Sequence, residues 1–120
     1  MRAELRPGRR AHQIHADLDV RPDDIVIDKF RFSGFVRTDL HERLSARGVD
    51  TLIVAGTVTN YCCQGTARDA MLLDYRVLMP PDATAAASDA VHNATYADLS
   101  NMGVFDLRPS TALVDDLRQA

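Results

Sequence analysis

The 120-residue chain has no tryptophan, one lysine and two cysteines, and the two cysteines are adjacent. Adjacent cysteines do not form the bridged framework of small secreted domains, so we expect free thiols and a cytoplasmic protein. No apolar run approaches the roughly 18 residues of a membrane-spanning helix, so we expect no membrane partner. The net charge is −3 and no basic face stands out, which argues against nucleic acid as a partner.

The chain has enough apolar residues for a core, and its predicted strands and helices alternate. Apolar residues make up 46% of the chain, close to the globular average. Strand-like runs alternate with helix-like stretches: strands are predicted at 25–27, 51–56, 75–80 and 104–107, and helices at 38–48, 60–73, 88–103 and 109–120. This order predicts one α/β domain over 1–120, with a mainly parallel sheet between helices. The continuous apolar run 51–56 is typical of a strand covered on both faces. Residues 1–20 show no clear pattern, and we expect them to be poorly ordered.

Cys62 and Cys63 lie where α/β proteins bind ligands. They follow the carboxyl end of the predicted strand 51–56 and fall in the first turn of the next predicted helix. Free amides and the dipole at a helix N-terminus favour a thiolate, and the same amides can form an oxyanion hole. Adjacent helical positions point about 100° apart, so at most one thiol faces a given pocket. The alternative is that both cysteines are small core residues.

Lys29 is the only lysine, and the other 13 of the 14 basic residues are arginine. It follows the predicted strand 25–27, at the strand end where a pocket is expected. A compact amine beside a thiol can stabilise the thiolate or exchange protons with it. The alternative is an ordinary solvated lysine.

A series of short motifs runs in order through residues 20–120. They are Lys29, Phe32-Ser33-Gly34-Phe35, Thr38 with Leu40, Gly56, Thr59-Asn60-Tyr61-Cys62, Thr66-Ala67-Arg68-Asp69-Ala70, and Asp82-Ala83. Together they resemble the isochorismatase-like cysteine hydrolases, a family that includes nicotinamidases, N-carbamoylsarcosine amidases, and ureidoacrylate and biuret amidohydrolases. The resemblance implies a Rossmann-like, three-layer α-β-α fold.

The resemblance also implies roles for individual residues. In an Asp-Lys-Cys triad, Cys62 would be the nucleophile and Lys29 the triad lysine, while Cys63 would be a packing residue. A cis peptide bond would join Thr57 to Val58, and the amides of Val58 and Cys62 would form the oxyanion hole. The expected substrate pocket includes three further residues: Phe35, Asn60 and Tyr61.

One part of the family pattern does not occur. The triad aspartate would lie in an apolar-Asp-x-Gln segment at the end of the first strand, and this chain has no such segment. We therefore expect a chain that begins after the family's first strand and helix and lacks the general base. The metal-binding cluster of nicotinamidases would also lie mostly in that part, and neither His12 nor His15 has a clear ligand-spaced partner. We expect no metal and no cofactor.

Two functions remain. The first is a cysteine-dependent hydrolase that cleaves a C–N bond of a small amide or ureide through a thioester. The missing aspartate would lower its rate by about 10³-fold or more. The alternative is a catalytically inactive family fragment that acts as an oligomer or interaction subunit. A redox pair is disfavoured because the Cys-x-x-Cys spacing is absent. In either case we expect a homo-oligomer.

Overall fold

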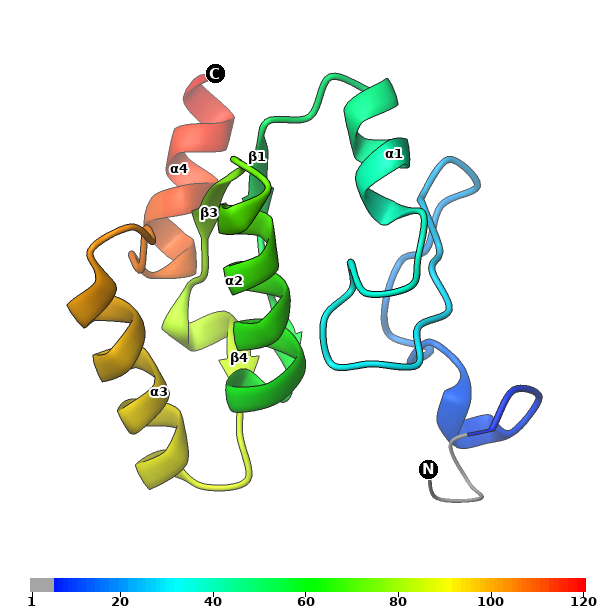
Figure 1. Cartoon of the computed structure of the whole chain (residues 1–120), viewed down its shortest axis with the longest axis horizontal. Coiled ribbons are helices and arrows are strands. Elements are labelled where there is room, and N and C mark those ends of the chain that lie inside the picture. The colour runs from blue at the N-terminus through cyan, green and yellow to red at the C-terminus, as the bar shows by residue number, and fades with distance from the viewer. Residues whose placement is uncertain (1–5) are drawn as a thin grey trace.

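Two short pairs of parallel strands form the centre of the computed structural model, which describes residues 6–120 (Figure 1). The pairs are β1 (Thr51–Ile53) with β3 (Arg76–Leu78), and β2 (Gly56–Thr57) with β4 (Thr84–Ala85). Leu78 also forms a parallel bridge with Asp106, within the strand predicted at 104–107. Parallel pairing requires a crossover connection between the two strands, and in both pairs a helix supplies it.

Four α-helices and three shorter helical turns complete the described residues. The α-helices are α1 (Leu40–Ala46), α2 (Gln64–Leu72), α3 (Asp89–Met102) and α4 (Ser110–Gln119). The 3₁₀ turns span Arg10–His12 and Pro81–Ala83, and a π-helical turn spans Thr59–Cys63. Helix α3 has the predicted ends: the Ser88 hydroxyl accepts from the Val91 amide at 3.3 Å, and Gly103 closes the helix at φ 69°.

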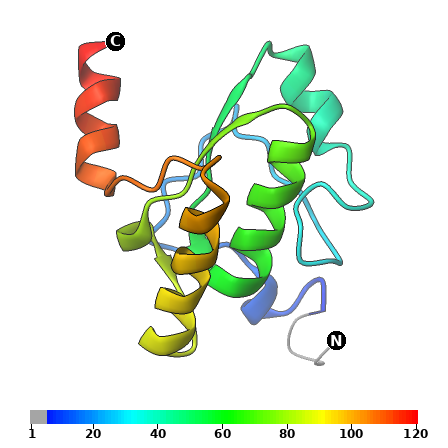
Figure 2. The same cartoon turned by 60° about the vertical axis from the view of Figure 1, so that its left-hand side comes forward.

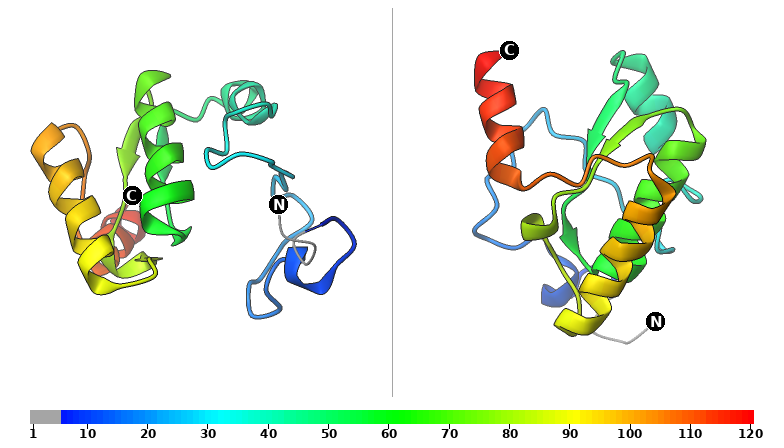
Figure 3. Two further views of the ribbon diagram at one scale, coloured as in Figure 1. Left: turned by 60° about the horizontal axis from the view of Figure 1, so that its bottom comes forward. Right: turned by 90° about the vertical axis from the view of Figure 1, so that its left-hand side faces the viewer.

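Helices cover both faces of the strands, as the α/β prediction requires. Helices α2 and α3 lie side by side on one face, and α4 lies on the other (Figures 2 and 3). Successive side chains of β3 point to opposite faces of the strand, and each face has its own helical cover. Val77 joins the core cluster beneath α2, while Leu78 lines a hollow shared with α4. None of the described helices is long and apolar enough to cross a membrane.

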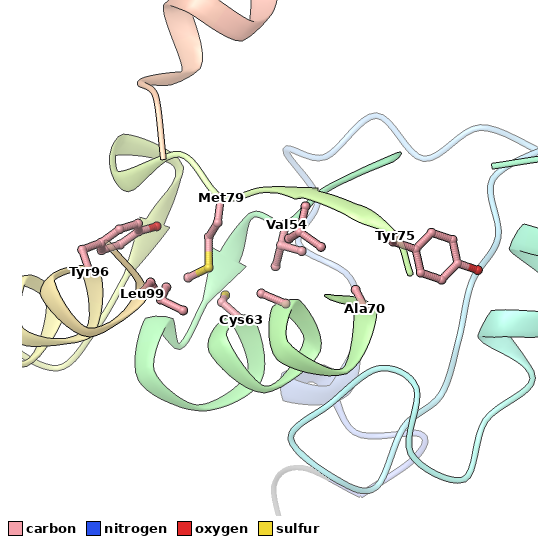
Figure 4. Packing of buried hydrophobic residues seen from close by; sticks show 9 residues of the cluster. Val54, Cys63, Ala70, Tyr75, Met79, Tyr96 and Leu99 are labelled. Atoms are coloured by element: carbon pink, nitrogen blue, oxygen red, sulfur yellow. The ribbon is translucent and has the colours of Figure 1, made fainter. Parts of the chain in front are cut away.

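The core lies between the strands and the α2–α3 layer (Figure 4). Ala67 and Ala70 are fully buried, and their small side chains let α2 approach the strands closely. Met79 and Leu99 fill the space between the strands and α3 and have no exposed surface. The full cluster is Val54, Cys63, Ala67, Ala70, Tyr75, Val77, Met79, Tyr96 and Leu99.

Three sequence predictions about strands were wrong in whole or in part. In the described part of the chain, the strand predicted at 104–107 is reduced to the single bridge at Asp106. Residues 25–27 form no strand, because no backbone within residues 6–120 pairs with them, although Ile25 and Ile27 are half-buried. The run 51–56 divides into β1 and β2 and is not covered on both faces, since Ile53 is 46% exposed. Among residues 6–120, β1 bonds to β3 on one edge only, and its other edge faces the segment before α1.

The N-terminal region follows a winding path on the side of α2 that faces away from α3 (Figures 1 and 3). The expectation of poor order over 1–20 falls in part on residues 1–5, which lie outside the described residues. Residues 6–20 contain turns and one 3₁₀ turn, and almost all of them are exposed.

Candidate functional site

The adjacent cysteines end a π-helical turn that leads from β2 into α2. The peptide bond between Thr57 and Val58 is cis, at the position that the family resemblance implies. The Val58 carbonyl then accepts from the amides of Tyr61 and Cys63, at 3.1 and 3.2 Å. The second of these bonds spans five residues, which makes the turn wider than an α-helix. Cys62 is the next-to-last residue of this turn, two residues before the start of α2.

The two thiols differ in exposure, although both residues border the same cleft. Cys63 is 3% exposed and packs in the core with Met79 and Leu99 (Figure 4), which confirms its expected packing role. Burial, with the neighbouring Cys62 adding a smaller effect, raises the pKa of Cys63 to about 11. Cys62 is half-buried and lines an open cleft. The structure thus offers one accessible thiol and one core thiol that remains protonated at neutral pH.

Lys29 lies beside the accessible thiol. Its Nζ is 3.4 Å from the Cys62 Sγ and donates to the Arg31 carbonyl at 2.9 Å. Thirty-three sequence positions separate the two side chains, so the fold alone brings them together. In the described part of the chain, every ion pair joins an arginine or histidine to a carboxylate, and none involves Lys29.

The segment that carries Lys29 is attached to α2. The Gly34 amide donates to Thr66 Oγ1 at 2.9 Å, and the Thr38 hydroxyl donates back to the Gly34 carbonyl. Gly65 faces the same segment, and a Cβ there would lie 3.7 Å from the Phe32 Cβ, in ordinary contact. Thr66 is four residues after Cys62, so these contacts set the lysine segment against the helix that begins after the π-helical turn.

A cleft of about 350 Å³ opens over the Cys62–Lys29 pair. Its other walls are mostly apolar, and they come from the lysine segment, α1, β1 and the start of α2. Of the three residues expected at a substrate pocket, Phe35 lines this cleft and also stacks on Tyr75 at 5.8 Å between ring centroids. Tyr61 lies outside the lining and stacks on Phe32 at 4.9 Å, with half of its surface exposed. Asn60 is also outside, and its buried Oδ1 has no hydrogen-bond partner within residues 6–120.

A hydrogen-bonded layer that the sequence did not reveal lies behind the π-helical turn Thr59–Cys63. Thr59 is fully buried, and its Oγ1 is 3.0 Å from the Nδ1 of His92 in α3. One turn later, the Tyr96 hydroxyl contacts Thr84 Oγ1 at 2.8 Å and donates to the Pro80 carbonyl. Nothing in the helix pattern of 88–103 distinguishes His92 from a solvated residue, so only the tertiary fold identifies it.

Histidines near the N-terminus make only pairwise contacts. His12 Nε2 is 3.8 Å from Asp28 Oδ1, and His15 Nδ1 is 3.7 Å from Asp17 Oδ2. Over the residues that the structure describes, no group of three or more His, Cys, Asp or Glu side chains could hold a metal ion.

Comparison with known proteins identifies the family of the chain. A family model described as the isochorismatase domain matches residues 1–106. The chain belongs to the isochorismatase family. A probable inactive nicotinamidase from Arabidopsis thaliana is 46% identical over 83 residues, which are 68% of this chain and 42% of that relative. A ureidoacrylate amidohydrolase from Variovorax paradoxus is 40% identical over 80 residues, which are 67% of this chain and 32% of that relative.

Solved structures of the family share the fold. A cysteine hydrolase from Pseudomonas syringae matches 96% of this chain and 59% of its own, with a TM-score of 0.89 and 31% identity. An isochorismatase family protein from Desulfovibrio vulgaris matches 92% of this chain and 58% of its own, with a TM-score of 0.86 and 40% identity. This chain spans less than half the length of the two curated relatives and less than two thirds of these structures.

Proposed function

We propose that this isochorismatase-family chain carries the nucleophile of a hydrolase that cleaves a C–N bond in a small amide or ureide. The observation that carries the proposal is the 3.4 Å contact between Lys29 Nζ and Cys62 Sγ at an open, mostly apolar cleft. A cation beside a half-exposed thiol at a helix N-terminus is the setting in which cysteines are reactive. The names of the relatives, nicotinamidase and ureidoacrylate amidohydrolase, support an amide or ureide as substrate.

The proposed reaction has two steps. The Cys62 sulfur attacks the carbonyl carbon, an S–C bond forms, the C–N bond breaks, and the nitrogen leaves as ammonia or an amine with the proton that Lys29 delivers. A water molecule then attacks the thioester carbon and returns a proton to Lys29, and the C–S bond breaks to release the acid. The amides of Val58 and Cys62 would stabilise the oxyanion in both steps. No cofactor takes part.

The cleft limits the substrate to a small molecule. A volume of about 350 Å³ is at the lower end for ligand pockets. Besides the lysine and the two cysteines, the only polar side chains that line it within residues 6–120 are those of Thr57 and Thr66. Phe35 would contact the substrate directly. Asn60 and Tyr61, which lie outside the lining, would support the turn or contact a substrate that extends out of the cleft.

The test is ammonia release from a panel of small primary amides and ureides. We expect turnover by the chain and by Cys63→Ser, and none by Cys62→Ser. Intact mass after rapid acid quenching should show an acyl group on Cys62. Turnover that persists in Cys62→Ser would contradict the proposal.

An inactive interaction subunit is the second candidate, because Lys29 has no carboxylate partner among the described residues and β1 has an unpaired edge. It predicts no ammonia from any panel member, together with a chain that still forms oligomers. Adding a family-like first strand with its aspartate to the N-terminus separates the candidates. A gain in turnover supports the hydrolase, and no gain supports the subunit.

A further inference from the structure

His92 contacts the π-helical turn from behind, away from the cleft. Its Nδ1 is 3.0 Å from Thr59 Oγ1, and Thr59 is the first residue of the π-helical turn that contains Cys62. Thr59 has no exposed surface, so its hydroxyl has no access to solvent. A buried hydroxyl without a partner costs free energy, so this bond favours one position of Thr59 over others.

Tyr96 extends the same contact surface to β4, the strand that pairs with β2. It lies one helical turn after His92, and the two rings pack at 4.8 Å between centroids. The Tyr96 hydroxyl contacts Thr84, and Thr84 pairs with Gly56 across β4 and β2. Helix α3 therefore contacts the first residue of the turn directly, through His92, and reaches the strand that enters the turn, β2, only by way of Thr84 in β4.

The turn has an unusual hydrogen-bond pattern of its own. The Cys63 amide reaches back five residues to the Val58 carbonyl at 3.2 Å, and the Gln64 amide bonds to the Thr59 carbonyl. Such turns are rare and occur mostly at functional sites. If Thr59 moved, the Cys62 sulfur would move relative to Lys29, since Cys62 is only three positions after Thr59.

The contact holds Thr59 without requiring a particular proton. A threonine hydroxyl can donate to an unprotonated Nδ1 or accept from a protonated one by rotating about its C–O bond. Both tautomers of the imidazole, and its charged form, can therefore make the bond. His92 acts by position and does not transfer a proton.

We propose that His92 is a positioning residue for Cys62, which acts through Thr59 to hold the thiol beside Lys29. This inference rests on the proposed function in one respect, that Cys62 is the reactive thiol. It adds a role for α3 that neither the cleft nor the motifs around the cysteines contain.

The test compares second-order rates of Cys62 alkylation by iodoacetamide, with the label mapped by peptide mass. We expect His92→Leu to lower the rate by about fivefold, the factor that corresponds to one hydrogen bond. His92→Asn, which keeps a donor and an acceptor near the Nδ1 position, should restore most of the rate. His41→Leu is the matched control, because His41 Nδ1 also bonds to a hydroxyl, that of Tyr75 at 2.8 Å, but lies on α1. It should leave the Cys62 rate unchanged.

A double-mutant cycle shows whether His92 acts through Thr59. In a Thr59→Val background, His92→Leu should cause no further loss of rate. Equal rates in His92→Leu and the parent chain, or additive losses in the cycle, would overturn the inference. So would a loss accompanied by labelling of Cys63, since that pattern indicates general loosening of the core. Failure of the proposed function looks different, because the parent chain itself would then show no preference for Cys62.

Discussion

Replacing Thr66 with valine should release the segment that carries Lys29 from α2. Thr66 Oγ1 accepts the Gly34 amide at 2.9 Å, and this bond joins positions 32 residues apart. Valine has nearly the same shape as threonine but cannot accept, so the partly buried amide loses its partner. Leaving such a donor unpaired costs about 1–3 kcal/mol.

Hydrogen exchange measures this loss directly. Amides in residues 29–38 should exchange about 5- to 150-fold faster in Thr66→Val, as that range of free energy predicts. If the segment unfolds together with the rest of the domain, the urea midpoint should also fall by about 0.5–1.5 M, for a typical slope near 2 kcal/mol/M.

Two control variants isolate the hydroxyl. Thr66→Ser keeps the acceptor and should exchange like the parent chain. Thr51→Val removes an exposed hydroxyl that donates only to the adjacent Asp50 at 2.7 Å, and it should change stability by no more than about 0.5 kcal/mol. If Thr66→Val exchanges residues 29–38 at the parental rate, the hydrogen bond does not hold the lysine segment and the reasoning fails.

Three further predictions concern the core and its ionisable groups. Leu99→Ala should lower the free energy of unfolding by about 2–5 kcal/mol in urea titrations, because Leu99 is fully buried between α3 and the strands. Hydrogen bonds from Arg108 hold the pKa of Asp106 below its usual value in the folded protein. The ionised Asp106 therefore stabilises the fold above pH ~4, and this contribution is lost as the pH falls through the lowered pKa. Asp106→Asn should therefore cost about 1–3 kcal/mol at neutral pH and flatten the acid limb of the stability profile. Burial raises the pKa of Cys63 to about 11. The protonated thiol is favoured in the folded state, so the free energy of unfolding should fall as the pH rises from about 8.5 toward that value. In Cys62→Ser, thiolate absorbance at 240 nm should appear only in strongly alkaline solution.

The order of helices could be predicted from sequence because each carries local signals. Helix α3 starts after Ser88 and ends at Gly103 as expected, since a side-chain cap and a left-handed glycine act within one turn of the chain. Helix α2 begins later than predicted, because Thr59–Cys63 adopts a wider π-helical turn. The sequence pattern of these residues fits an α-helix and a π-helical turn equally well.

The prediction of a strand at 25–27 was wrong for a reason that no local pattern reveals. Apolar residues make a strand only where another strand supplies hydrogen bonds, and the described chain has none beside this run. The same limit applies to the site. The motifs around Cys62 and Lys29 were visible in the sequence, but His92 and Thr66 depend on contacts between segments about 30 residues apart.

We expect Cys62, and not Cys63, to be the reactive thiol. The most direct test is to alkylate the folded chain with iodoacetamide at pH 7.5 and count the label on each cysteine by fragment mass. With a pKa of about 11, Cys63 is about 3 × 10⁻⁴ thiolate at that pH, and burial slows it further. We predict that at least about 99% of the first label is on Cys62. Equal labelling, or preference for Cys63, would contradict the account.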